Sequence, residues 1–403
     1  MRTFLTCLFS CLQFLVLAQN NRIQEMPHWV GYLQMNDRLT IPFDFYFDNT
    51  KTKRGLSIRN GKEWIYLKTK TKKDSLVAFF KEFDAKLIFK LKQDDGARGY
   101  WINYNKTKPI RIPFTAQKLA IPKFECSNSQ EDTLKLSMKY KVDFEKSKTT
   151  SIGKFYYDDQ EIHGTFRTET GDYRFLSGCA TGQTIRLSSF NGNWAMLLEA
   201  QVHGDTIRGH LYSGTTYSTF FEGVADKDFA LKNPDELTKV INEQSFAFSE
   251  IVNLRNRKYR ASKYQNKVVL YQIMGTWCPN CIDEAKCYKA LFEKYNKSGL
   301  EIHGLAYEIE RPNVKTTLRA LRRFKKRMGL NYPIFYAGKA SKEIASKQFP
   351  MLNQISSFPT SILVGKTGKI EYIHTGFNGP ATGDVYYEFI EHLEAKIEQL
   401  LEE

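Results

Sequence analysis

The sequence predicts an all-β region followed by an α/β domain. Up to about residue 224, short runs of alternating or aromatic-rich residues are separated by Gly, Asn and Asp clusters, which is typical of antiparallel strands and their turns. Beyond residue 234, strand-like apolar runs alternate with helical patterns, which favours a sheet covered by helices. We therefore expect an all-β sandwich or barrel-like domain over residues 19–233 and an α/β domain over residues 234–403.

The β-rich region contains a faint internal repeat. Residues 84–104 and residues 191–212 share one pattern, a strand, a polar turn with Asp and Gly, and a second strand. Such hairpins are the units of sandwiches and barrels built from meanders.

The first residues have the layout of a secretory signal peptide. A basic residue precedes an apolar run over residues 4–18, and a polar stretch follows. Val16 and Ala18 are the small residues that a signal peptidase requires, so we expect cleavage after Ala18 and removal of residues 1–18. An uncleaved anchor and a lipoprotein acylated at Cys11 are the alternatives. We expect the mature chain to have no transmembrane segment and to be exported, to the periplasm or the envelope.

Charge limits the classes of partner. The chain has 59 Lys and Arg against 44 Asp and Glu, a formal charge of +15, and the excess is spread over both regions. The densest basic runs, residues 68–73 and 319–327, would suit nucleic acid. For an exported protein solvated basic faces are the better interpretation, and we expect no nucleic-acid partner.

Five of the seven cysteines lie beyond the predicted signal peptide. An odd number in an oxidising compartment leaves at least one unpaired. Cys126 and Cys179 fall in the β-rich region, where they either form a disulfide or remain two buried thiols. Cys287 lies nine residues beyond Cys278, on the opposite side of a helix, which favours a packing role.

The C-terminal region has a definite order of predicted elements. Residues 268–273 are apolar on both faces, which suits a central strand, and a short helix is expected before it over residues 235–242. The following elements are a helix over 279–295, a strand over 301–307, a helix over 316–328, a strand over 332–336, a helix over 341–348, a hairpin of strands 361–364 and 370–375, and a helix over 384–401. This order is that of a thioredoxin-like domain with an inserted helix.

The candidate reactive pair lies at the start of the first long helix, where residues 278–281 read Cys-Pro-Asn-Cys. Unpaired N–H groups and the positive end of the helix dipole favour a thiolate at Cys278, the expected nucleophile. Cys281 lies one turn further in and is placed to attack a mixed disulfide on Cys278. A structural disulfide and half of a zinc site are the alternatives. Because no second CxxC or close Cys/His cluster exists, we expect neither metal nor cofactor.

A Phe-Pro-Thr sequence precedes the predicted hairpin. In this topology Pro359 is expected to be a cis-proline packed against the cysteine pair, with a backbone edge where an extended substrate segment can pair. Its neighbours Phe358 and Thr360, together with Trp277 and Pro279 beside the nucleophile, are the expected substrate contacts.

Glu284 stands three residues after Cys281 and falls on the same side of the helix. One interpretation makes it a proton acceptor or electrostatic tuner for the buried thiol. The other makes it a first-turn acid that suits the helix dipole. Both interpretations stay open on the sequence.

Three features of residues 268–380 occur together. They are a tryptophan before the CxxC motif in VVLYQIMGTWCPNCIDEAKCY, an inserted helix, and the proline loop in FPMLNQISSFPTSILVGKTGKIEYIHTGFNGP. This combination resembles the TlpA/ResA-like family of exported bacterial thioredoxin-fold proteins. The resemblance implies that Cys278 attacks, Cys281 resolves, Pro359 is the cis-proline and Glu284 is the active-site acid.

Two features depart from the family's pattern. Many relatives carry a proline where this chain has Lys286, so the usual cause of a helix kink is missing there. The long β-rich region resembles that of proteins from Bacteroidetes-type bacteria only loosely.

Together these observations predict a thiol-disulfide oxidoreductase that reduces or isomerises disulfides of exported proteins. A membrane thiol donor is a candidate source of its electrons. One alternative is a peroxidase of the peroxiredoxin group, although the lone cysteine in a Thr- and Pro-bearing loop that such enzymes use is not found. Another is a β-rich module that binds glycans or protein partners and carries an accessory thioredoxin domain.

Overall fold

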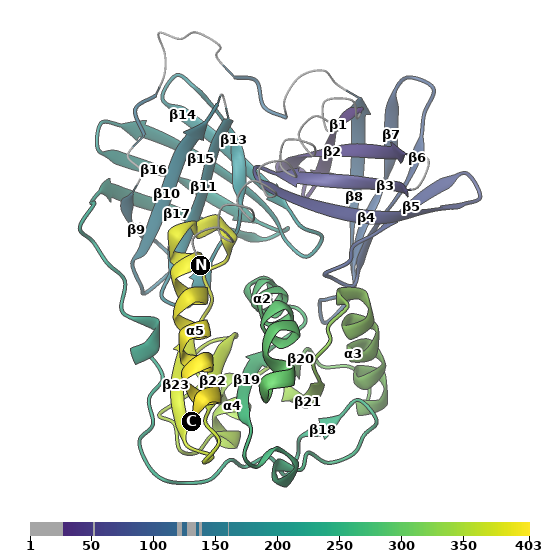
Figure 1. Cartoon of the computed structure of the whole chain (residues 1–403). Helices are drawn as coiled ribbons and strands as arrows, with labels where there is room; N and C mark the ends of the chain where they lie inside the picture. The colour runs from purple at the N-terminus through teal and green to yellow at the C-terminus, as the bar shows by residue number, and fades with distance from the viewer. Residues whose placement is uncertain (1–26, 51–52, 119–122, 127–133, 137–138, 160) are drawn as a thin grey trace, which may run out of the picture.

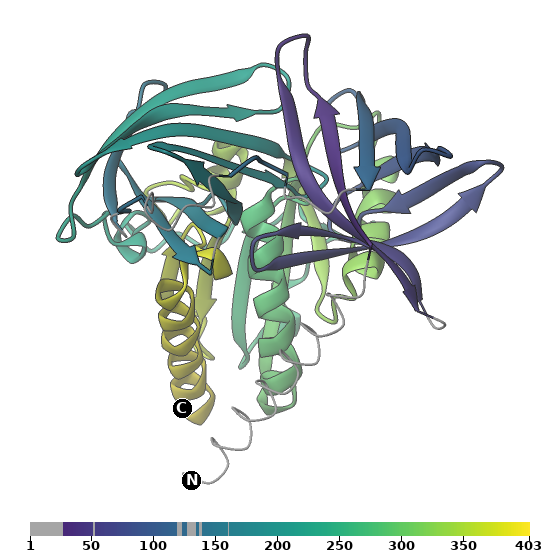
Figure 2. The ribbon, with the colours of Figure 1, turned by 90° about the horizontal axis from the view of Figure 1, so that it is seen from above.

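The computed structural model describes residues 27–50, 53–118, 123–126, 134–136, 139–159 and 161–403. The predicted signal peptide lies outside these residues. Two β units lie side by side on top of an α/β domain (Figure 1), and they remain side by side when seen from above (Figure 2). Among the described residues, no helix has the length and apolarity needed to cross a membrane.

The first β unit is a closed barrel in which each strand pairs with its neighbour in the chain and the last pairs with the first. Its interior holds stacked aromatic rings, such as Phe43 against Phe114 at 5.7 Å between ring centroids. It is therefore a packed core, as in other small barrels. Its strands are β1 (His28–Gln34), β2 (Thr40–Thr50), β3 (Lys53–Asn60), β4 (Glu63–Lys72), β5 (Ser75–Phe79), β6 (Ala85–Leu91), β7 (Gly96–Asn103) and β8 (Ile110–Lys118).

The second β unit is a nine-stranded antiparallel sheet with its own hydrophobic core. Its order is β10-β9-β17-β16-β15-β14-β13-β11-β12, and an additional pairing of β10 with β11 brings the two ends of this order together. The barrel-like alternative for the β-rich region is thus confirmed. The strands are β9 (Tyr140–Phe144), β10 (Ser151–Asp158), β11 (Glu161–Thr168), β12 (Gly171–Asp172), β13 (Leu176–Thr181), β14 (Thr184–Phe190), β15 (Ala195–His203), β16 (Thr206–Ser213) and β17 (Tyr217–Ala225).

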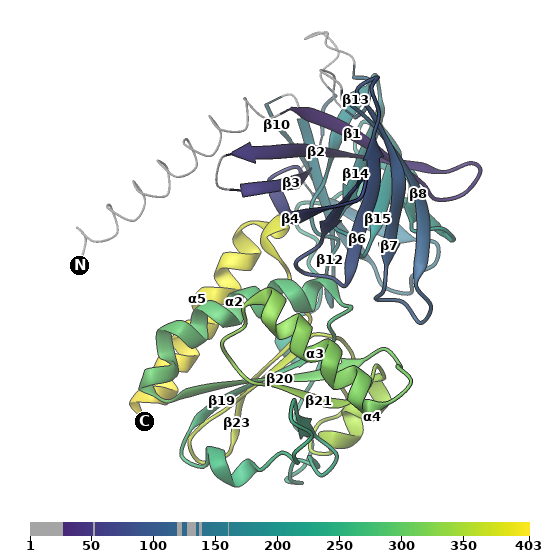
Figure 3. The ribbon, with the colours of Figure 1, turned by 90° about the vertical axis from the view of Figure 1, so that its right-hand side faces the viewer.

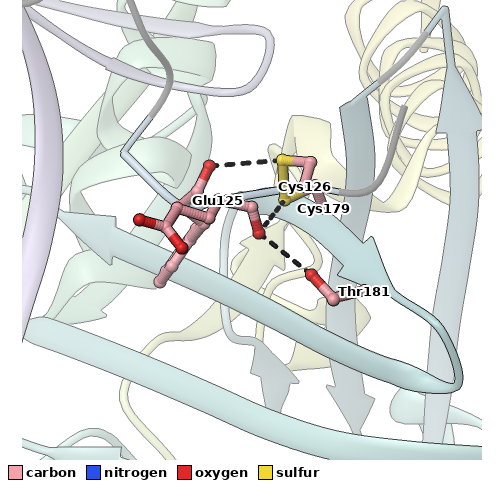
Figure 4. The surroundings of a disulfide bond; sticks show 5 residues. Glu125, Cys126, Cys179 and Thr181 are labelled. Carbon is pink, nitrogen blue, oxygen red and sulfur yellow. Dashed lines mark hydrogen bonds between the residues drawn. A yellow bond between two sulfur atoms is a disulfide. The ribbon is translucent and has the colours of Figure 1, made fainter.

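A disulfide between Cys126 and Cys179 joins the segment before this sheet to β13, which decides between the two alternatives for these cysteines (Figure 4). Beside it the Thr181 hydroxyl donates to the Glu125 carbonyl at 3.0 Å.

The turn between β14 and β15 fastens the two β units together. Phe190 packs against the barrel residues Phe43, at 4.7 Å, and Trp101, at 5.0 Å, between ring centroids. The Trp101 indole N–H donates to the Gly192 carbonyl at 3.0 Å. Gly192 has a φ of +88° and a Cβ there would lie 2.3 Å from the Phe80 ring, so only glycine fits this turn.

The α/β domain has a six-stranded sheet in the order β18-β21-β20-β19-β22-β23. β19, β20 and β21 are parallel, whereas β22 and β23 are antiparallel, which is the thioredoxin-like arrangement. Helices α2, α3 and α5 pack on one face and α4 on the other (Figure 3). The elements are β18 (Val252–Asn253), β19 (Val268–Met274), α2 (Pro279–Tyr295), β20 (Leu300–Glu308), α3 (Val314–Met328), β21 (Ile334–Lys339), α4 (Lys342–Gln348), β22 (Thr360–Val364), β23 (Ile370–Thr375) and α5 (Asp384–Glu402).

The prediction of a helix over residues 235–242 is wrong. Only one short 3-10 turn forms there, Pro234–Glu236. The Ile241 N–H donates to the Met351 carbonyl at 2.8 Å instead of to a helical partner, because this segment lies along the loop that follows α4.

Candidate active site

The cysteine pair lies at the N-terminus of α2, directly after the buried strand β19. Cys278 caps the helix, and its Sγ accepts a hydrogen bond from the Cys281 N–H at 3.3 Å. Cys278 retains 7% of its surface exposed and Cys281 none, and both are free thiols. Burial, reinforced by the neighbouring Cys278, raises the pKa of Cys281 well above its usual value. The outer thiol is therefore the accessible one and the inner thiol stays protonated.

The proline loop lies against the outer thiol. The Phe358–Pro359 peptide is cis, as expected, and the Cys278 thiol donates to the Phe358 carbonyl at 3.4 Å. The Pro359 carbonyl accepts from the Gly376 N–H at 2.8 Å. Because proline has no N–H and its carbonyl is occupied, Pro359 itself offers no free backbone edge. The Phe358 carbonyl is occupied too, since it also accepts from the Ser357 hydroxyl at 3.3 Å.

The other expected substrate contacts differ in their exposure to solvent. Trp277 is half-buried, with its ring edge-on to Phe358 at 5.8 Å between centroids, and Pro279 is also half-buried. Thr360 is fully buried and its hydroxyl donates to the Ser357 carbonyl at 3.0 Å. The Thr360 side chain thus supports the proline loop from behind.

Glu284 is completely buried beneath the pair. One carboxyl oxygen accepts from the Gln272 amide at 2.8 Å, and the other lies 2.7 Å from the Ser361 hydroxyl and 3.1 Å from the Tyr288 hydroxyl. The same Gln272 amide donates to the Cys281 carbonyl at 3.2 Å. Burial raises the pKa of Glu284 to about 7, although the three hydrogen bonds oppose this rise. Glu284 is therefore a buried carboxyl that is hydrogen-bonded to three side chains, and the Gln272 amide links it to the backbone of Cys281.

Glu308, at the end of β20, was missed on the sequence. Its carboxylate accepts from the Thr276 N–H at 2.9 Å and from the Thr276 hydroxyl at 2.7 Å. The Trp277 indole donates to the Tyr307 carbonyl at 3.0 Å. These bonds fix the loop that presents Cys278. The position of Glu308 at the end of a predicted strand was a usable signal. The carboxyl ends of neighbouring parallel strands meet at one edge of a sheet, and the reactive loop follows the neighbouring strand β19.

The β region contacts the reactive loop directly. The Asn193 amide, in the turn between β14 and β15, donates to the Trp277 carbonyl at 2.7 Å. On the other side of the motif, the Asn280 amide donates to the Phe377 carbonyl at 3.1 Å. Gly171 packs against Asn280 so closely that a Cβ would lie 1.9 Å from the amide nitrogen. No pattern in the sequence indicated these partners, since they lie far from the motif in the chain.

An ion-pair cluster joins all three units one turn into α2. Arg174, from the second β unit, pairs with Glu63 and Glu82 of the barrel and with Asp283 of α2, the last at 3.2 Å. Lys286 pairs with Glu82 and with Asp283, the latter at 3.1 Å. Lys286 occupies the position where many relatives have a proline, and α2 runs through it as a single helix.

Cys287 is buried and free. Burial raises its pKa to about 12. Among the described residues no group of three or more His, Cys, Asp or Glu side chains is arranged to hold a metal ion.

The fold and the site together define a thioredoxin-fold domain with a dithiol pair at a helix N-terminus. Residues 241–373 match the AhpC/TSA family. The chain is 30% identical over 128 residues to the thiol-disulfide oxidoreductase ResA of Geobacillus kaustophilus, a match that covers 31% of this chain and 64% of that protein. With ResA of Halalkalibacterium halodurans the identity is 27% over 164 residues, covering 40% and 77%.

Two solved structures are similar to part of the chain. A thiol-disulfide isomerase from Corynebacterium glutamicum has a TM-score of 0.31 and 19% identity, and covers 41% of this chain and 97% of that one. A thiol:disulfide interchange protein of the thioredoxin family from Chlorobium tepidum has a TM-score of 0.29 and 17% identity, covering 40% and 99%.

The resemblance to the TlpA/ResA-like family is confirmed for the C-terminal region, which is a thioredoxin-fold domain related to the ResA oxidoreductases. The chain covers less than two thirds of the length of the first of these relatives.

Proposed function

We propose that the protein is a thiol-disulfide oxidoreductase that reduces or isomerises disulfides of exported proteins through Cys278 and Cys281. The observation that carries the proposal is the asymmetry of the pair. Cys278 lies at the helix N-terminus beside the Phe358 carbonyl and keeps 7% of its surface exposed, whereas Cys281 lies one turn further in and has none exposed. This asymmetry supports Cys278 as the thiol that reacts with the client and Cys281 as the thiol that reacts second.

The reaction has two exchanges. The Cys278 thiolate attacks one sulfur of the client disulfide; the client S–S bond breaks, a mixed disulfide forms, and the leaving sulfur takes up a proton. Cys281 then loses its proton and attacks the Cys278 Sγ; the Cys278–Cys281 disulfide forms, the mixed disulfide breaks, and the released client sulfur takes up a proton. The client gains two electrons, and an external thiol, for which a membrane donor is a candidate, restores the pair. If a client thiol attacks the mixed disulfide instead, the client is isomerised.

Glu284 serves the second exchange. A buried carboxyl whose pKa is about 7 can change its protonation state near neutral pH. When ionised, it raises the pKa of the Cys281 thiol by charge repulsion. Protonation of Glu284 therefore removes a penalty on the Cys281 thiolate at the step where that thiolate is required.

The test is to trap the intermediate. In Cys281→Ala the second exchange cannot occur, so cells exporting this variant should accumulate reductant-sensitive covalent adducts whose identity names the clients. Cys278→Ala should give none, and the matched variant Cys287→Ala should behave like the parent. Adducts that form equally in Cys278→Ala would contradict the mechanism.

Two other outcomes would identify the alternatives. Consumption of hydrogen peroxide that requires Cys278, without any reduction of protein disulfides, would indicate a peroxidase. Capture of a glycan or protein that is unchanged in Cys278→Ala, with no adducts in Cys281→Ala, would indicate a β-rich binding module. Detection of the chain in the periplasm or envelope, with residues 1–18 removed, tests the proposed export.

A further inference from the structure

A cavity of about 480 Å³ lies where the second β unit meets the start of α2. We propose that it binds a large apolar side chain, aromatic or long aliphatic, in the client segment that flanks the disulfide attacked by Cys278. The inference rests on the proposed oxidoreductase function. The main lining residues are Tyr173, Trp194, Met196, Leu211, Tyr217 and Pro279.

The cavity is adjacent to the nucleophile. Pro279 and Asn280, the two residues between the cysteines, form part of its wall. A client joined to Cys278 through a mixed disulfide must place the residues next to its own cysteine against the surfaces around Cys278. This cavity is one of those surfaces, so a flanking side chain can enter it while the disulfide is exchanged.

The cavity is also preformed. The Asn280 amide is held by the Phe377 carbonyl at 3.1 Å, and the turn before Trp194 is held by the bond from Asn193 to the Trp277 carbonyl at 2.7 Å. Binding into a rigid cavity requires little additional ordering, which favours affinity.

The chemistry of the walls selects an apolar ligand. Arg174 also lines the cavity, but its guanidinium is already paired with three carboxylates. Asp172 accepts from the Gly379 N–H at 2.7 Å and from the Arg174 N–H at 2.8 Å. Both charged groups are therefore occupied, and a charged client residue would find no free partner.

Most of the remaining wall is apolar or aromatic, with the neutral polar residues Asn191, Ser213 and Asn280 beside it. Aromatic rings offer large contact area, and a methionine adapts to side chains of different shape. The volume falls within the usual range for a ligand pocket. These properties suit a preference for Phe, Leu or similar residues as a class, and not for a single residue.

The experiment measures kcat/KM for peptide pairs joined by one disulfide, with Phe, Leu, Ser or Glu beside the cysteine. The parent should prefer the Phe and Leu peptides by about ten-fold. Ser213→Phe fills the cavity from its wall and should reduce kcat/KM for these peptides to that of the Ser peptide. Reduction of bis(2-hydroxyethyl) disulfide, which has no such side chain, should be unchanged. Ser75→Phe, on a barrel strand, is the matched control.

A second variant opens the cavity instead. Tyr217 is 43% exposed, so Tyr217→Ala should fold and should weaken the preference; Tyr100→Ala, at a barrel tyrosine that is 38% exposed, is its control. Tyr217 also lines a second cavity, whereas Ser213 lines only the first. Ser213→Phe therefore shows which of the two cavities is responsible for the preference.

The outcomes separate the two proposals. If all peptides are reduced through Cys278 without any apolar preference, or if the preference survives in Ser213→Phe, the inference is overturned and the oxidoreductase function stands. A preference for Glu or Ser peptides overturns it as well. If no disulfide is reduced, the proposed function fails and the inference fails with it.

Discussion

Glu284 should make the stability of the α/β domain depend on pH in a direction opposite to that of most carboxylates. Burial raises its pKa from an ordinary value of 4.5 to about 7. Between these two pH values the folded chain keeps a proton that the unfolded chain has lost. The contribution of Glu284 to stability is therefore complete below about pH 4.5 and is lost as the pH rises through about 7.

The magnitude follows from the same values. One unit of pKa corresponds to 1.36 kcal/mol, so the rise from 4.5 to about 7 is worth about 3 kcal/mol of unfolding free energy. In Glu284→Gln the side chain is neutral at every pH. We expect the stability of the variant relative to the parent to increase by about 3 kcal/mol between pH 4 and pH 8.

Hydrogen exchange of β19 peptides, corrected for the intrinsic rates, measures this difference for the domain that contains Glu284. Parent and variant should both carry Cys278→Ala and Cys281→Ala, so that no active-site thiol titrates. Burial also raises the pKa of Asp172 to about 6. Because Asp172 is present in both chains, its contribution to the pH dependence cancels in the difference. Glu343→Gln, at an exposed position of α4, should show no comparable change. A relative stability of Glu284→Gln that is the same at pH 4 and pH 8 would refute the assignment of a raised pKa.

Two further predictions concern the thiols and the ion-pair cluster. In the reduced protein at pH 8, iodoacetamide should label Cys278 long before Cys281 or Cys287, because burial raises the pKa of both inner thiols; mass spectrometry showing equal rates would contradict the asymmetry of the pair. Arg174→Met leaves Glu63 without its cation and leaves Glu82 and Asp283 with Lys286 alone, and should cost about 3–5 kcal/mol in urea unfolding. Arg208→Met, which removes an exposed pair, should cost less than about 1 kcal/mol, and equal costs would show that the cluster is not a buried network.

The α/β domain was largely predictable because its signals are local. The helix predicted over residues 279–295 has the observed bounds, and the strands on either side of it differ by one residue or so at each end. A buried strand followed by a capped helix is defined by neighbouring residues. The failure over residues 235–242 has the opposite cause. Asp235 pairs with His374 at 2.7 Å, and distant partners of this kind leave no trace in the local pattern.

The β region was predictable as a class but not as two units. The repeat between residues 84–104 and residues 191–212 corresponds to the hairpins β6–β7 and β15–β16, one in each unit. Closure of the barrel depends on β1 pairing with β8, and closure of the second unit on β10 pairing with β11 in addition to β9. Those choices depend on packing between residues far apart in the chain, which a single sequence does not display.

The same distinction applies to the site. Cys278 and Cys281 are defined by spacing, and Glu284 by helical periodicity, so all three were candidates from the sequence. Asn193 and Arg174 act through contacts that exist only after the β units dock. A turn residue and an isolated arginine have no distinguishing pattern.

Lys286 helps to join the β units to the α/β domain through ion pairs. A proline at this position of a helix removes one backbone hydrogen bond and kinks the chain, whereas here the helix continues and the lysine amine reaches Glu82 of the barrel and Asp283 of the same helix. Glu82 is also paired with Arg174, so each charge in the cluster compensates charges from other units. Because leaving one of these buried charges without its partner is costly, the cluster disfavours any docked arrangement of the units other than this one at the helix that begins with the cysteine pair. The β units therefore hold a fixed position beside Cys278, which is the condition for a wall of the second unit to select what Cys278 attacks.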